Sequence, residues 1–80
     1  MTVTELKRIL NAEGFRPDMY SLAGGLPNEA HCIEDRGSEW AVYYSERGER
    51  SEERLFLSET EACEFFLERI RGDPTAKPRL

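Results

Sequence analysis

Apolar residues recur at helical spacing near the start of the chain, where they predict the first helix. One face of this helix would carry Val3, Leu6, Ile9 and Leu10. Thr2 and Glu5 have the spacing of a capping box, so we expect the helix to begin at this point. Gly14 can adopt the positive φ that commonly follows a helix, so we expect the helix to end there.

A second helical pattern occupies the last third of the chain. Its apolar stripe consists of Ala62, Phe65, Phe66 and Ile70, broadened by Cys63 and Leu67. Ser58 and Glu61 predict another capping box, and Leu57 is placed to form a hydrophobic staple with Ala62. Gly72 follows the last apolar position, so we expect the helix to end there.

Three segments between these helices predict β-strands, at 29–34, 39–45 and 54–57. The middle segment is the clearest, because two sets of side chains alternate along it: Trp40, Val42 and Tyr44 with Ala41, Tyr43 and Ser45. Short connections favour antiparallel pairing between successive strands. The segment at 20–30 contains Gly24, Gly25 and Pro27, which indicate a turn-rich connection.

The order of these elements predicts an α+β fold of α-β-β-β-α layout. We expect a three-stranded antiparallel meander with two helices packed on one face, because each helix is apolar on one side only. The core would be formed by Trp40, Phe56, Phe65 and Phe66. Residues 1–72 would make a single domain, and residues 73–80, which hold two prolines and few apolar side chains, a flexible tail.

The distribution of charge narrows the classes of partner. The net charge is −5, made up of zero at 1–28, −8 at 29–68 and +3 at 69–80. This acidic body repels phosphate backbones and attracts basic proteins, so we expect no nucleic-acid partner. No apolar run approaches the ~18 residues of a membrane span, and no secretory signal pattern is evident, so we expect a cytoplasmic protein without a membrane partner.

The residues that carry most enzyme chemistry are sparse. His31 and Cys32 are neighbours on a predicted strand and would point to opposite faces, while Cys63 lies on the apolar face of the second helix. A closed zinc site needs four ligands, so we expect no metal and no cofactor. The glycine-rich connection lacks the lysine of a phosphate-binding loop. We therefore expect a protein that is not an enzyme, with two reduced, unreactive thiols.

The stretch "YYSERGERSEERLF" raises the main functional question. Its seven charged side chains are Glu46, Arg47, Glu49, Arg50, Glu52, Glu53 and Arg54. One interpretation is structural, because opposite charges across a hairpin pair weakly and also protect a sheet edge from unwanted pairing. The other is functional: Tyr43 would stand on the uncovered face of the sheet as an anchor, beside arginines. The predicted partner-binding residues are Tyr20, Tyr43, Glu46, Arg47, Glu49, Arg50, Glu52 and Glu53.

Part of the chain, from about 20 to 67, carries a pattern of residues that resembles a known family. The similar positions are Tyr20–Leu22, Gly24–Glu29, Cys32–Glu34, Trp40, Val42–Gly48, Phe56, Ser58–Glu59 and Glu61–Cys63. The pattern resembles small bacterial immunity proteins of polymorphic-toxin and contact-dependent inhibition systems, which have the same α-β-β-β-α layout. The resemblance carries no family binding residue to this chain.

The resemblance implies a protein that binds a cognate toxin domain, blocks its site and performs no chemistry. An acidic inhibitor suits a basic toxin domain, since opposite charge accelerates association. The alternative is a small self-associating or accessory protein-interaction domain, in which an unpaired strand edge could form a homodimer.

Overall fold

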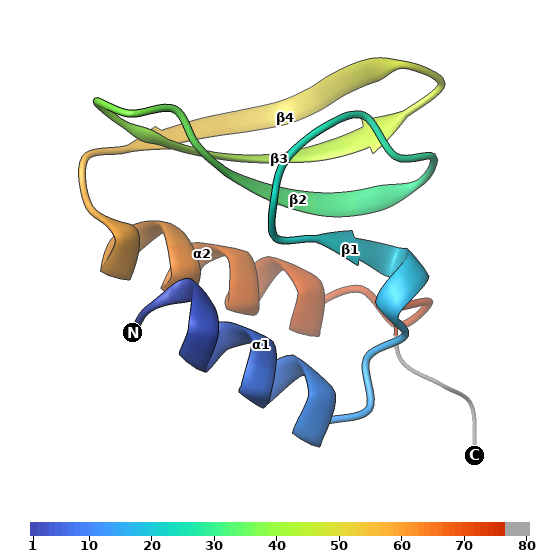
Figure 1. Cartoon of the computed structure of the whole chain (residues 1–80). Helices are drawn as coiled ribbons and strands as arrows, with labels where there is room; N and C mark the ends of the chain where they lie inside the picture. The colour runs from blue at the N-terminus through green and yellow to red at the C-terminus, as the bar shows by residue number, and fades with distance from the viewer. Residues whose placement is uncertain (77–80) are drawn as a thin grey trace.

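The computed structural model describes residues 1–76 and has an α+β fold (Figure 1). The elements are α1 (Val3–Ala12), the 3-10 helix η1 (Pro17–Met19), β1 (Tyr20–Ser21), β2 (Ala30–Asp35), β3 (Trp40–Glu46), β4 (Glu49–Phe56) and α2 (Glu59–Arg71). The strands form one sheet in the order β1-β2-β3-β4. Both helices lie on the same side of this sheet (Figure 1), as the amphipathic patterns predict.

The sheet is mixed, with one more strand than the sequence predicts. β2, β3 and β4 form the expected antiparallel meander. β1 adds a parallel edge, in which Tyr20 is opposite His31 and Ser21 is opposite Cys32. The three-stranded prediction missed β1 because two residues are too short to show an alternating pattern.

Strand β4 begins five residues earlier than predicted, at Glu49 instead of 54. The turn between β3 and β4 consists of Arg47 and Gly48, whose φ angles are 53° and 77°. A two-residue turn with positive φ at both positions matches the right-handed twist of a hairpin. The charged stretch is therefore the continuation of an antiparallel ladder.

Helix α1 has the predicted N-terminal cap. The Thr2 hydroxyl accepts a hydrogen bond from the Glu5 backbone N–H at 3.2 Å, and the Glu5 carboxylate accepts one from the Thr2 N–H at 3.3 Å. Gly14 has a φ of 79° and ends the helix as predicted. The chain then folds back, with the Phe15 N–H donating to the Leu10 carbonyl at 3.0 Å.

Helix α2 begins at its predicted cap but without the predicted staple. The Ser58 hydroxyl accepts from the Glu61 N–H at 3.1 Å. Leu57 is 87% exposed, so its side chain is in solvent and the predicted contact with Ala62 is wrong. The alternation of β4 continues through Phe56 and turns the next side chain away from the helices.

The main core lies between the sheet and the two helices. Its buried members include Leu6, Leu10, Ile33, Val42, Phe66 and Ile70. Of the four aromatic residues predicted to form the core, only Phe66 is fully buried. Trp40, Phe56 and Phe65 pack at its margin, and the Phe56 and Phe65 rings lie 5.2 Å apart.

The chain after α2 packs against the domain as far as Ala76. The Nε2 atom of His31 lies 2.9 Å from a carboxylate oxygen of Asp73. Ala76 is buried in the main core, and its carbonyl accepts from the Arg16 N–H at 3.2 Å. The tail predicted for 73–80 is therefore wrong for 73–76, because these contacts are distant in sequence. Residues 77–80 lie outside the described residues.

Candidate interaction surface

The charged stretch forms the hairpin tip and the outer strand of the sheet. β4 pairs with β3 on one side only, so its other side is an edge (Figure 1). The register shifts between Val42 and Tyr44, and Glu52 opposite this irregularity has a φ of 54°. Bulges of this kind twist an edge strand and discourage the addition of a further strand.

The arginines of β4 lie over aromatic rings. The Arg50 guanidinium is 5.2 Å from the centre of the Tyr43 ring, and that of Arg54 is 5.7 Å from the Phe65 ring. The guanidinium of Arg69, on α2, also lies over the Phe65 ring, 4.6 Å from its centre. It donates a hydrogen bond to the Glu52 carbonyl at 2.9 Å. These cations are thus engaged by the protein itself.

Arg36 joins β2 to β4 across the face of the sheet that is opposite the helices. Its guanidinium donates to Glu34 and to Glu53, each at 2.7 Å. Arg36 holds the pKa of Glu34 below its ordinary value, chiefly through this hydrogen bond. This bridge was not predicted, although Glu34 and Arg36 are two positions apart and so share a face.

Three glutamates at the hairpin have no arginine or lysine of the described residues paired with their carboxylates. Among residues 1–76, the carboxylates of Glu46, Glu49 and Glu52 form no ion pair or hydrogen bond. Glu46 and Glu49 stand directly opposite each other in the β3–β4 register. Like charges in that position destabilise a hairpin, so cross-strand pairing does not explain the charges at its tip. The hairpin tip therefore presents two adjacent carboxylates, Glu46 and Glu49, that form no ion pair with any residue among 1–76.

Tyr43 faces away from the helices, as its alternation predicts, but it is not an exposed anchor. Its side chain is fully buried, in a small second cluster with Cys32 and Ala41. Its hydroxyl donates to the Gly25 carbonyl at 2.7 Å, which ties the connection between β1 and β2 over this face. Burial raises the pKa of Tyr43. The predicted exposure of Tyr43 is wrong because this connection covers it.

Tyr20 does not join the hairpin residues either. It lies on β1, at the opposite edge of the sheet from β4. Three strand spacings separate the two edges, or about 14 Å. The predicted set therefore divides: Glu46, Arg47, Glu49, Arg50, Glu52 and Glu53 share the hairpin, whereas Tyr43 is buried and Tyr20 belongs elsewhere.

The two thiols lie on opposite sides of the sheet. Cys32 belongs to the second cluster, and Cys63 belongs to the main core on α2. Both are free and buried. Burial raises the pKa of each thiol to about 11, so little thiolate exists at neutral pH.

His31 is a structural residue that holds the end of α2. Its ring packs edge-on against Tyr44, with centroids 5.0 Å apart, and faces Phe66 at 6.5 Å. Nε2 contacts the Asp73 carboxylate, and Nδ1 is buried without a partner among the described residues. The contact with His31 is the main reason that the pKa of Asp73 lies below its ordinary value.

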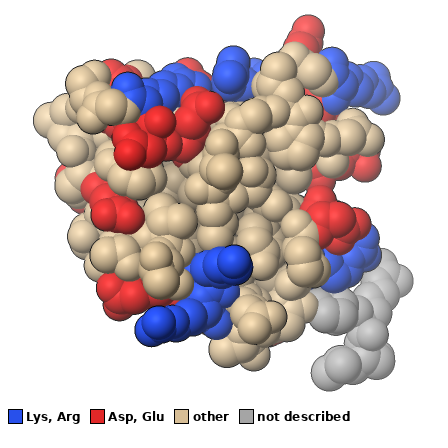
Figure 2. All heavy atoms as spheres, viewed as in Figure 1, with Lys and Arg blue, Asp and Glu red and all other residues tan. Residues whose placement is uncertain are grey.

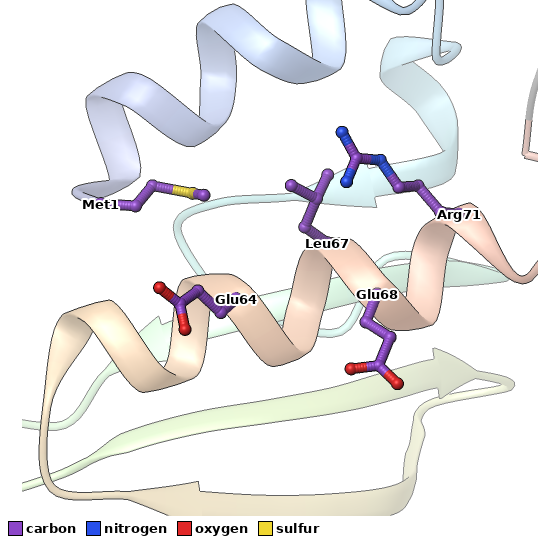
Figure 3. A pocket seen from close by; sticks show the side chains of 5 residues that line it. All are labelled: Met1, Glu64, Leu67, Glu68 and Arg71. Carbon is purple, nitrogen blue, oxygen red and sulfur yellow. The ribbon is translucent and has the colours of Figure 1, made fainter.

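Two grooves lie beside the helices. One, of about 410 Å³, runs between α1 and α2 and is lined by Met1, Glu64, Leu67, Glu68 and Arg71 (Figure 3). Its arginine is paired with Glu13, which leaves two carboxylates at the rim. The other, of about 350 Å³, lies on the far side of α1 and is lined by Lys7, Arg8, Asn11, Pro17 and Tyr20.

Comparison of the chain with protein-family models, curated proteins and solved structures finds no match. Within residues 1–76, neither helix has the length and apolar character needed to cross a bilayer. The same part of the chain holds no group of His, Cys, Asp and Glu side chains suited to a metal ion.

Proposed function

We propose that this protein is a non-catalytic binding protein that docks a basic protein domain on its β3–β4 hairpin, and that it acts as an immunity protein against a bacterial toxin domain. The observation that carries the proposal is the placement of Glu46 opposite Glu49 at the hairpin tip. These side chains oppose folding of the hairpin, and a cationic partner would relieve their repulsion.

The positions of the two arginines of β4 also support a basic partner. Arg50 and Arg54 lie over aromatic rings of the domain, and within residues 1–76 neither guanidinium forms an ion pair with a hairpin glutamate. With a net charge of −5, the protein has a field that steers basic partners toward it. Electrostatic steering speeds association, which suits an inhibitor that has to reach a toxin before the toxin acts.

Self-association is the second candidate. Leu55 and Leu57, near the end of β4, are 53% and 87% exposed, and exposed apolar side chains at an edge favour contact with a second copy. Against this, the Glu52 carbonyl is occupied by Arg69, and β4 is irregular at the same point. Both features disfavour the addition of a second β4 at this edge, which favours a partner that contacts the hairpin through its side chains.

Photo-crosslinking of this protein to its partner in cells of the native host tests the proposal. A benzophenone amino acid would replace Glu49 at the hairpin or, as the control, Glu64 on α2. Crosslinks formed at 49 and absent at 64 would identify a polypeptide by mass spectrometry. The captured domain should then arrest growth when expressed alone, and coexpression of this protein should restore growth.

The outcomes separate the candidates. A crosslink to the protein itself at 49 would favour self-association. A captured domain that does not affect growth would contradict the immunity proposal while leaving the hairpin as a binding surface. Growth restored equally by a variant with Glu46, Glu49 and Glu52 all changed to lysine would contradict the role of the hairpin.

A further inference from the structure

The groove of about 350 Å³ on the far side of α1 combines positive charge with an apolar wall. Lys7, Arg8 and Asn11 line it from α1, and Pro17 and Tyr20 line it from η1 and β1. It lies at the β1 side of the molecule, whereas the acidic hairpin is at the β4 side. Its volume is at the low end of the range for small-molecule sites, enough for a single ring with one substituent.

Neither cation of this groove is paired with an acid in the part of the chain that the structure describes. Residues 1–28 contain three acids and three bases. Two of the acids are neutralised by arginines, Glu13 by Arg71 and Asp18 by Arg16, whereas the Glu5 carboxylate accepts hydrogen bonds from Thr2 at the start of α1. Within residues 1–76, neither Lys7 nor Arg8 forms an ion pair or a hydrogen bond through its side chain.

The acid closest to the groove in sequence is Asp18, beside Pro17. Arg16 contacts it at 3.2 Å and holds its pKa below the ordinary value, so its charge is already matched. An otherwise acidic chain therefore keeps two free cations side by side. Figure 2 shows Lys and Arg side chains over α1, low in the view, well apart from those along the top of the molecule.

The apolar wall of the groove is fixed in place. Tyr20 packs against the main core and is half-buried, while its backbone pairs with β2. Pro17 has a rigid backbone as the first residue of η1. A ring and a proline with little freedom lose little entropy when a flat apolar group packs on them.

We propose that this groove binds a small ligand in which a planar ring carries a phosphate monoester. Lys7 and Arg8 contact the phosphate, whose charge of about −1.5 to −2 matches the two cations. The ring lies against Tyr20 and Pro17, and the Asn11 amide donates to a phosphate oxygen. This inference is independent of the hairpin and of the toxin partner.

Phenyl phosphate is the probe that tests this site. In a titration followed by ¹⁵N–¹H correlation spectra, saturable shifts should appear at the Asn11 side-chain amide and at the Tyr20 backbone amide. Inorganic phosphate should produce weaker binding, because it lacks the ring. Benzylamine, which has the ring but the opposite charge, should leave both signals unmoved.

Matched variants locate the binding. Lys7→Gln with Arg8→Gln should weaken phenyl phosphate binding at least about tenfold, because both charge-assisted hydrogen bonds to the phosphate are lost. Arg47→Gln, which removes an exposed cation at the hairpin tip, should leave it unchanged. Equal binding of inorganic phosphate, equal loss in the Arg47 variant, or no saturable shift at Asn11 and Tyr20 would each overturn the proposal.

Discussion

Replacing Tyr43 tests how the face of the sheet opposite the helices is built. The ring is fully buried with Cys32 and Ala41 and lies under the connection that runs from β1 to β2. Arg50 covers part of the ring, and the hydroxyl holds the Gly25 carbonyl at 2.7 Å. A Tyr43→Ala change would remove the largest side chain of this cluster and release the connection above it.

The expected loss follows from burial. Truncating a buried aromatic side chain to alanine costs ~3–5 kcal/mol. For a domain of this length, each kcal/mol lowers the melting temperature by about 4–8 °C, so the drop should be at least about 12 °C. Tyr43→Phe keeps the ring and removes only the hydrogen bond to Gly25, at a cost of ~0.5–1.5 kcal/mol.

Thermal unfolding followed by far-UV circular dichroism measures these losses. Leu57→Ala is the matched control, because the removed side chain is in solvent and the change should stay within ~0.5 kcal/mol. The order of melting temperatures should be parent and Leu57→Ala, then Tyr43→Phe, then Tyr43→Ala. A Tyr43→Ala protein that melts with the parent would show that Tyr43 is not enclosed and would refute the packing of this face.

Three other predictions concern separate parts of the domain. Asp73→Asn should destabilise the protein, because the contact with His31 holds the pKa of Asp73 below its ordinary value of 3.8. The stabilisation from this contact is present above pH 3.8 and is lost as the pH falls through the lowered pKa, so parent and variant should converge in acid unfolding titrations. Cys32 and Cys63 should resist a thiol reagent at neutral pH while folded and give two free thiols in denaturant without reductant; none in denaturant would contradict their free state. Phe66→Ala should cost ~3–5 kcal/mol in urea unfolding, and an unchanged midpoint would contradict its place in the core.

The helices were the most predictable part of this chain, because their signals are local. The capping box of Thr2 and Glu5 and the ending at Gly14 depend on residues within one or two turns. The side of the sheet on which Tyr43 lies was equally predictable, because side chains alternate between the two faces along a strand. Its burial was not, because the connection that covers it approaches from another part of the chain.

Strand β4 shows a different limit. Its residues are mostly charged, a composition that is depleted in strands, and Arg47–Gly48 is not one of the common hairpin turn sequences. The opposition of Glu46 and Glu49 depends on that turn, so the register could not be read before the turn was known. The Arg36 bridge to Glu53 likewise needs the register of two strand pairs.

The central claim, that the acidic hairpin binds a basic domain, is tested most directly with two variants of equal charge. One carries glutamine at the hairpin glutamates Glu46, Glu49 and Glu52; the other carries glutamine at Glu39, Glu64 and Glu68. Each has a net charge of −2, three units above the parent value of −5. Any effect of overall charge is therefore the same in both.

The measurement is the association rate constant with the captured domain by stopped-flow, at low and high salt. If the hairpin binds a basic domain, the hairpin variant should associate at least about tenfold more slowly than the parent at low salt, and the control variant should lose much less. The difference between the two variants should shrink as salt screens the charges. Equal losses in the two variants, or no loss in the hairpin variant, would contradict a binding role for this hairpin.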